Sequence, residues 1–156
     1  MNCNRRTFIQ QALVAGLQTG IFGGSLLATQ NAQATWLAED FTPGPLSATL
    51  KHLYNDAAIT QSEAITLKLP RIAENGAVVP ITVSTTLAKV SDIAIFVTKN
   101  PTPLSGKFKL SPDLEPVVSA RIKMAETSEV LAIVTSEGKL YKAFQEVKVT
   151  IGGCGG

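Results

Sequence analysis

Alternation of apolar and polar residues through most of residues 64–151 limits what this chain can fold into. Successive side chains on a strand point to opposite faces, so a period of two indicates strands with one buried face. Turn-forming residues interrupt the alternation at short intervals, as at Glu74–Gly76 and Asn100–Pro103. The expected strands are centred, in chain order, on Ile65, Leu67 and Leu69; Val79, Ile81 and Val83; Ile93, Ile95 and Val97; Phe108 and Leu110; Val118, Ala120, Ile122 and Met124; Glu129–Thr135; and Leu140–Ile151.

Seven short strands separated by turns predict an all-β fold, an immunoglobulin-like antiparallel sandwich. The chain lacks the pair of core cysteines and the central tryptophan that antibody domains use, because its one tryptophan, Trp36, precedes the first strand. Apolar residues at helical spacing predict a short helix over Leu46–Ala58, with Ser47 as a candidate cap. Pro80 suggests a sheet edge or a bulge, and a change of apolar parity near Gln145 suggests a second bulge.

The first 34 residues have the organisation of an export signal. Arg5 and Arg6, followed by Thr7-Phe8-Ile9, match the twin-arginine pattern. An apolar stretch follows that is too short and too polar for a confident membrane span, and it ends in a small-x-small site, Ala32-Gln33-Ala34. We therefore expect cleavage between Ala34 and Thr35 and export to the periplasm; the alternative is an uncleaved N-terminal anchor.

Charge excludes some classes of partner. The chain has 14 basic and 12 acidic residues, and loss of residues 1–34 removes Arg5 and Arg6 and no acidic residue, which leaves 12 of each sign. A neutral domain does not favour a nucleic-acid partner or an anionic membrane surface. The leader also carries Cys3, so Cys154 becomes the one cysteine of the exported protein. An unpaired cysteine outside the cytoplasm suggests an intermolecular disulfide or a reactive thiol.

The chain ends in Gly152-Gly153-Cys154-Gly155-Gly156. Glycine reaches backbone conformations closed to other residues, and a terminus without apolar side chains has nothing to dock, so we expect a flexible arm. Four residues at full extension span roughly 13–14 Å. A thiolate is a good nucleophile, and on such an arm it suits a carrier that enters the active sites of other proteins. The alternative is a frayed tail with an incidental cysteine.

The sequence contains no recognisable catalytic set, cofactor motif or metal site. The one histidine, His52, falls on the polar side of the predicted helix and is expected to be a surface residue. A catalytic pair of Cys154 and His52 is disfavoured, because catalysis needs a held geometry that a mobile tail does not provide. The glycines of the tail do not follow a strand and open a helix, as a phosphate-binding loop requires.

Residues 147–156, which read Val-Lys-Val-Thr-Ile-Gly-Gly-Cys-Gly-Gly, resemble the C-terminus of the SoxY family of sulfur-oxidation carriers. The twin-arginine leader, the Ala73–Gly76 turn and the all-β middle are similar to that family too. The resemblance implies a periplasmic heterodimer with a SoxZ-type subunit, and sulfur intermediates of thiosulfate oxidation held on Cys154. It implies transient contacts with SoxAX-, SoxB- and SoxCD-type enzymes, with no turnover and no cofactor of the carrier's own.

The expected organisation is therefore a leader over 1–34, a sandwich domain over 35–151 and a carrier arm over 152–156. Two other functions remain open. The chain could be an exported binding module whose cysteine forms a permanent interchain disulfide. Ubiquitin-like sulfur carriers also end in Gly-Gly and carry their cargo on the terminal carboxylate, here that of Gly156, although the leader and Cys154 argue against that class.

Overall fold

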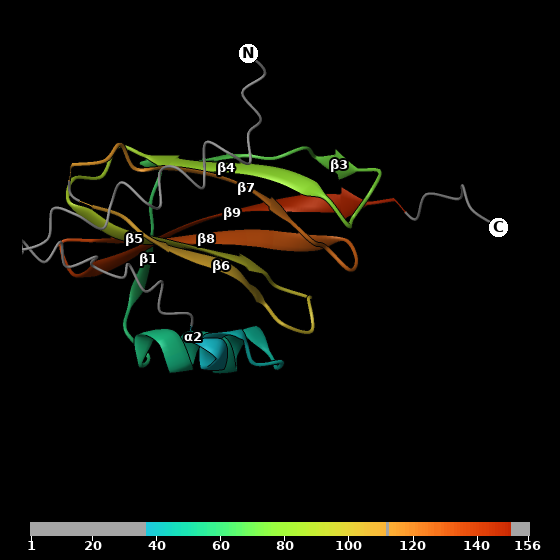
Figure 1. Ribbon diagram of the computed structural model, residues 1–156, viewed down its shortest axis with the longest axis horizontal. Helices are drawn as coiled ribbons and strands as arrows, with labels where there is room; N and C mark the ends of the chain where they lie inside the picture. Colours follow the sequence, from blue (N-terminus) through green and yellow to red (C-terminus); the bar gives the residue numbers. More distant parts are fainter. Residues whose placement is uncertain (1–36, 112, 151–156) are drawn as a thin grey trace, which may run out of the picture. The chain divides into compact units, whose positions relative to one another are not determined.

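The structure is a computed structural model that describes residues 37–111 and 113–150. Its core is a sandwich of two sheets (Figure 1). The larger has the strand order β1-β9-β8-β5-β6, with β3 also paired to β9, and the smaller has the order β2-β4-β7. The strands are β1 (Ile59–Gln61), β2 (Ile65–Lys68), β3 (Ile72–Ala73), β4 (Val79–Thr85), β5 (Val90–Val97), β6 (Leu104–Lys109), β7 (Val117–Ile122), β8 (Ser128–Ser136) and β9 (Lys139–Val149).

The seven predicted strands are all present, and the predicted immunoglobulin-like sandwich is confirmed. Two further strands, β1 and β3, pair with β9 in parallel, whereas the other pairings are antiparallel. They lie near opposite ends of β9: Ile59 pairs with Leu140, and Ile72 with Lys148. Strands of two or three residues are too short to show a period in the sequence.

The facing sides of the two sheets form the main hydrophobic core. Alternate residues of the predicted strands are fully or almost fully buried there. Members of this core include Ile65, Val79, Ile81, Val83, Ile93, Ile95, Val97, Val118, Ile122, Met124, Val130, Val134 and Val147. Burying apolar area of this extent is the main favourable term in folding.

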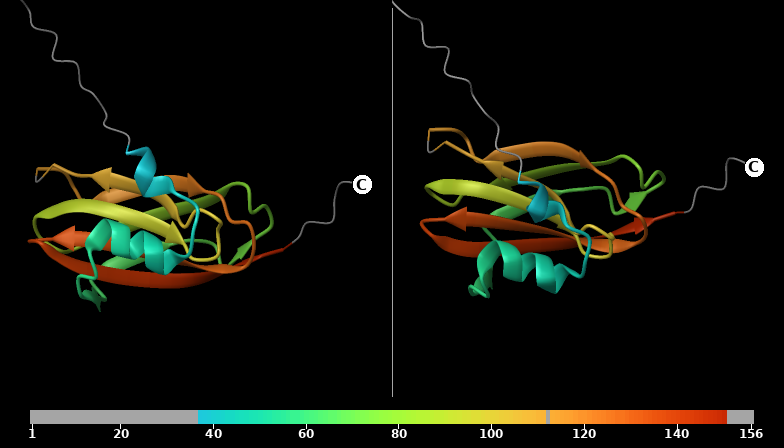
Figure 2. Two further views of the ribbon diagram at one scale, coloured as in Figure 1. Left: turned by 90° about the horizontal axis from the view of Figure 1, so that it is seen from below. Right: turned by 60° about the horizontal axis from the view of Figure 1, so that its bottom comes forward.

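A short helix, α2 (Leu46–Tyr54), covers the other face of the larger sheet (Figure 2). Leu50 and Leu53 pack there against a second buried cluster that includes Phe96 and Ile133. This cover explains why Ile93–Val97 is buried without alternation. A 3-10 turn, η1 (Ala38–Phe41), precedes the helix.

Three details of the chain differ from the sequence-based predictions. The helix ends at Tyr54, before the predicted end, because Asn55 takes the left-handed conformation with φ 48°. Ser47 lies inside the helix and caps nothing, and the carbonyl of Pro45 accepts the first helical N–H bonds. No bulge occurs near Gln145, since the register of β9 with β8 is continuous.

The parity change on β9 has another cause, which is that apolar residues occupy both of its faces. Tyr141, Val147 and Val149 face the main core, whereas Leu140 belongs to the cluster under the helix. The predicted edge position of Pro80 is confirmed locally, because among the described residues β4 has no partner there on its β2 side. Pro80 lies on the central strand β4, beyond the last residue that pairs with β2, and its register partner is Arg121 of β7.

A tight turn joins β8, which ends at Ser136, to β9, which begins at Lys139. Glu137 and Gly138 both have positive φ, at 49° and 74°, as a tight hairpin turn between β8 and β9 requires. Among the helices within 37–111 and 113–150, none has the length and apolar content to cross a membrane.

Candidate functional site

The last strand leads directly to the predicted site, and its end is fixed by β3 (Figure 1). The N–H of Lys148 donates to the carbonyl oxygen of Arg71 at 2.9 Å, and the N–H of Thr150 donates to that of Ala73 at 3.1 Å. These bonds extend the parallel pairing of β3 with β9 to Thr150, the last described residue. The position from which the C-terminal segment begins is therefore part of the sheet.

Thr127 holds the same strand end from the other side. The N–H of Val149 donates to Thr127 Oγ1 at 3.0 Å, and the Thr127 hydroxyl lies 3.5 Å from the Val149 carbonyl oxygen, which accepts from it. One side chain thus satisfies both backbone polar groups of a residue that no longer pairs with β8, where the register ends at Val147.

The turn after β3 packs against this strand end. The N–H of Met124 donates to the carbonyl oxygen of Gly76 at 2.7 Å, and Asn75 Oδ1 accepts from the N–H of Ala77 at 2.9 Å. A Cβ at Gly76 would overlap the carbonyl oxygen of Met124 and lie 3.0 Å from Val149 Cγ1. The predicted turn is present, and its glycine is required by this close approach.

Charged groups of both signs surround the strand end. Arg71, Glu74 and Lys148 are exposed there. Lys99, whose N–H donates to the Ser128 hydroxyl, pairs with Glu126 at 3.6 Å. A thiolate needs a cation or a similar stabilising group to form at neutral pH. Among the described residues, this mixed surface offers no concentrated positive charge that would favour a thiolate.

The residues predicted to form the carrier arm, Gly152, Gly153, Cys154, Gly155 and Gly156, lie outside the described residues. So do Arg5 and Arg6 of the leader and the cleavage pair Ala34 and Thr35. Cys154 follows Thr150 by four residues, so it can lie at most roughly 13–14 Å from that anchored position.

His52 lies on α2, which covers the outer face of the larger sheet. Its Nε2 is 3.1 Å from Asp40 Oδ1, and its side chain is half exposed. Both residues line a pocket of about 280 Å³ between η1 and α2, and its described lining includes no serine or cysteine. His52 is a surface residue, as predicted, although the sequence did not reveal Asp40 as its partner.

Other titratable groups give no catalytic set among the described residues. No cluster of three or more histidine, cysteine, aspartate or glutamate side chains in that part of the chain could hold a metal ion. Burial, and then the nearby carboxylates of Asp92 and Asp40, raise the pKa of Tyr54 far above its usual value. This phenol stays neutral at physiological pH, so it cannot act as a base.

Sequence reasoning found the cysteine and the strand that leads to it, but it missed the two groups that anchor this strand. β3 has only two residues, and Thr127 lies in an irregular connection between β7 and β8. A threonine in a loop has no sequence signal that distinguishes it from a solvent-exposed one. Its role follows from its two contacts with Val149.

Comparisons with known proteins agree with this arrangement. The family model of the sulfur oxidation protein SoxY matches residues 50–154, so the matched range ends on Cys154. The solved structure of the sulfur carrier protein SoxY from Chlorobium limicola f. thiosulfatophilum is 42% identical, with a TM-score of 0.62; the match covers 68% of this chain and 96% of that one. No curated protein matches the sequence.

More distant structures share the sandwich alone. A superoxide reductase (neelaredoxin) from Ignicoccus hospitalis has a TM-score of 0.52 at 15% identity, over 59% of this chain and 94% of that chain. A second structure of this reductase has a TM-score of 0.51 at 17% identity, over 56% and 81%. At these identities the likeness concerns the fold and carries no activity to this chain.

Fold and site together define a class of protein, a two-sheet sandwich without a catalytic set of its own in the described residues, whose last strand leads into a cysteine-containing C-terminal segment. Within that class, the family match and the 42% identity to a solved relative decide the assignment. The chain belongs to the SoxY family of sulfur oxidation proteins.

Proposed function

We propose that this chain is a sulfur carrier that holds intermediates of thiosulfate oxidation covalently on Cys154 and presents them to partner enzymes. The observation that carries the proposal is the family match through Cys154, the one cysteine that remains after the proposed loss of the leader. The relative from Chlorobium limicola is itself described as a sulfur carrier protein. The anchored end of β9 supports the same role, because it gives the arm a fixed origin.

The proposed loading step joins two sulfur atoms. The Cys154 thiol loses its proton and bonds to the outer sulfur of thiosulfate, which gives a Cys–S–S–SO₃⁻ adduct. Two electrons leave in this step, and a haem enzyme of the SoxAX type accepts them. Water then cleaves the terminal sulfur–sulfur bond in a SoxB-type hydrolase, which releases sulfate and leaves a persulfide on Cys154.

In this scheme the chain provides the thiol, the arm and the recognition surface, and it catalyses no reaction of its own. A SoxCD-type dehydrogenase, where one is present, oxidises the persulfide sulfur. A SoxZ-type subunit forms the heterodimer. The glycines on both sides of Cys154 support passage into a narrow active site, because their lack of a Cβ keeps the arm thin and its backbone adaptable.

Intact mass spectrometry tests the carrier role. The full chain, purified with its partner subunit, is incubated with thiosulfate and the oxidising enzyme. We expect a mass increase of one thiosulfate unit, mapped to the peptide that contains Cys154, and no increase in Cys154→Ser. An adduct on Cys154→Ser, or on the carboxylate of Gly156, would contradict the proposal. A permanent covalent dimer on a non-reducing gel, with no loading, would favour the disulfide-linked binding module.

We also propose export to the periplasm by the twin-arginine route. The double variant Arg5→Lys/Arg6→Lys should accumulate in the cytoplasm at the mass of the precursor, whereas the parent protein should be periplasmic and begin at Thr35. Cell fractionation and N-terminal sequencing measure both. Arg71→Lys/Arg121→Lys, which makes the same change outside the leader, is the matched control. Equal export of the leader variant would show that another route is used.

A further inference from the structure

Strand β6 is an open edge of the larger sheet. It pairs with β5 on one side, and within the described residues no strand pairs with its other side. β2 contacts β9, so β7 and β6, the strands at the far ends of the two sheets, come to the same side of the sandwich. An unpaired edge presents a row of backbone N–H and C=O groups that can bond to another strand.

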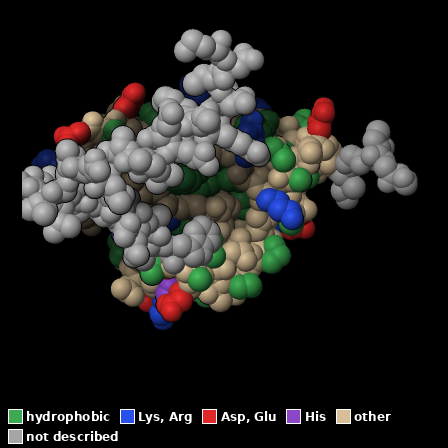
Figure 3. Space-filling model, viewed as in Figure 1, with side chains coloured by type: hydrophobic (Ala, Val, Ile, Leu, Met, Phe, Trp, Pro, Cys, Tyr) green, Lys and Arg blue, Asp and Glu red, His purple; other side chains and the backbone are tan. Residues whose placement is uncertain are grey.

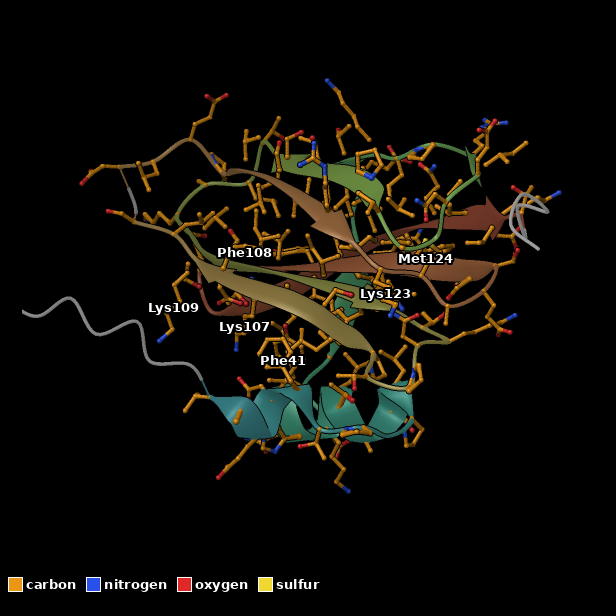
Figure 4. The ribbon with its side chains drawn as sticks, turned by 45° about the vertical axis from the view of Figure 1, so that its right-hand side comes forward. Phe41, Lys107, Phe108, Lys109, Lys123 and Met124 are labelled. Atoms are coloured by element: carbon orange, nitrogen blue, oxygen red, sulfur yellow. The ribbon has the colours of Figure 1, made fainter. Side chains whose placement is uncertain are left out.

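The two faces of β6 differ in chemistry. Phe108 points into the sandwich, where it packs against the main core, whereas Lys107 and Lys109 lie on the α2 face (Figure 4). The Phe108 ring also covers Gly106, with a ring carbon 3.0 Å from where a Cβ of that glycine would lie. The Lys107 ammonium is 5.6 Å from the centre of the Tyr54 ring, which places it over the end of the helix.

Apolar side chains are visible on this side of the molecule. In the space-filling view, hydrophobic atoms lie at depth in a hollow between the two sheets (Figure 3). Phe108 is half-buried, so one part of its ring packs on the core and another part remains accessible. If a strand were added beside β6, every second side chain of that strand would lie on the same face of the sheet as Phe108, and the nearest of them could cover the accessible part of its ring.

The two lysines of β6 form no salt bridge with the described residues. Within 37–111 and 113–150, no carboxylate lies within ion-pair distance of Lys107 or Lys109. Asp92 is the register partner of Lys109, but one of its oxygens is buried and the other accepts a hydrogen bond from the Ser91 hydroxyl at 3.1 Å. The α2 face of the edge therefore carries two positive charges that a partner can neutralise.

The same charges disfavour pairing with a second copy of this chain. In an antiparallel β6–β6 pair with its faces aligned, lysines would stand opposite lysines, and like charges in that position are destabilising. Lysine on an edge strand is a known means of blocking self-association. A strand that pairs with β6 must instead carry negative charge on the face that contains Lys107 and Lys109.

We propose that β6 docks an extended strand of a partner protein, one that alternates acidic with apolar side chains. Its acidic residues would lie about 5 Å from Lys107 and Lys109 across the new pair, and its apolar residues would cover Phe108. The inference deepens the partner component of the proposed function. Its test measures binding without sulfur chemistry, so either proposal can fail while the other stands.

The probe is a short fluorescent peptide that alternates glutamate with valine. We expect it to bind the full chain in an anisotropy titration, with new protection from hydrogen exchange in the β6 amides. Lys107→Glu/Lys109→Glu should weaken binding by about tenfold or more. The control, Lys68→Glu/Lys139→Glu, makes the same charge change on exposed lysines of other strands and should bind as the parent does.

Two further probes separate strand pairing from simple charge attraction. A peptide methylated on alternate backbone nitrogens, so that its pairing edge is blocked, should lose binding, and a lysine–valine peptide should not bind. Equal binding of the methylated peptide, equal weakening in both double variants, or protection that appears on β2 or β7 would overturn the proposal. Concentration-dependent dimers of the chain with protected β6 amides would also overturn it, in favour of self-pairing.

Discussion

At the scale of single residues, Tyr54 is the clearest departure from ordinary side-chain chemistry. Its hydroxyl is buried at the end of α2 and finds no hydrogen-bond partner among the described residues, and the same holds for Asp92 Oδ1. Burial is the largest cause of its raised pKa, followed by the charges of Asp92 and then Asp40. An unsatisfied buried hydroxyl costs about 1–3 kcal/mol, so this residue works against stability.

We expect Tyr54→Phe to be as stable as the parent at neutral pH, or more stable by about 1 kcal/mol. The free energies of unfolding of the parent and the variant should differ at alkaline pH. Above about pH 10 the unfolded chain ionises this phenol and the folded chain does not, so the parent's free energy of unfolding falls as pH rises. The variant lacks that contribution and should fall less steeply. Urea unfolding on both sides of pH 10 measures the difference; parallel pH curves would contradict the assignment.

Single residues also show how much of the candidate site could be predicted from the sequence alone. A single cysteine between glycines at the end of the chain was enough to predict the candidate site. The sequence could not show why Gly76 must be glycine, because the clash partner, Met124, is far along the chain. Nor could it show the contact of His52 with Asp40, which joins η1 to α2. Such contacts depend on how separate elements pack.

At the scale of elements, the end of β9 depends on both β3 and Thr127. Apolar alternation over parts of its eleven residues, as at Val147 and Val149, predicted β9 itself. It could not predict the two-residue β3, nor the double cover of the larger sheet that leaves Ile93–Val97 buried on both faces. A continuous apolar run shows burial but does not identify the covering element.

Thr127→Val should loosen this strand end without unfolding the domain. The change removes the hydroxyl that accepts from the Val149 N–H, at a cost of about 1 kcal/mol. Hydrogen exchange should become faster at Val149 and Thr150, while the centre of β9 keeps its protection. Thr127→Ser keeps the hydroxyl and should restore slow exchange. Equal exchange in the valine and serine variants would mean that β3 alone anchors the strand.

At the scale of the whole molecule, the proposed function assigns folding and sulfur carriage to different parts of the chain. Among the described residues, the two hydrophobic clusters extend to the end of β9, and the proposed cargo site, Cys154, follows five residues after Val149. Val149, near the end of the described chain, packs on the main cluster. We therefore expect the end of β9 to contribute to stability and, under the proposed function, the segment after it to carry the sulfur.

Two truncations test this division. Removal of residues 152–156, four of which are glycines, should change the free energy of unfolding by no more than about 0.5 kcal/mol and should abolish the sulfur loading proposed for Cys154. Removal of residues 148–156 should also destabilise the domain, because it deletes the Val149 side chain and the N–H bonds of Lys148 and Thr150 to β3. Urea unfolding and intact mass measure the two properties. If the shorter deletion destabilised the sandwich as much as the longer one, the arm would be part of the fold, and a carrier whose cargo segment is free to leave its own domain would be ruled out.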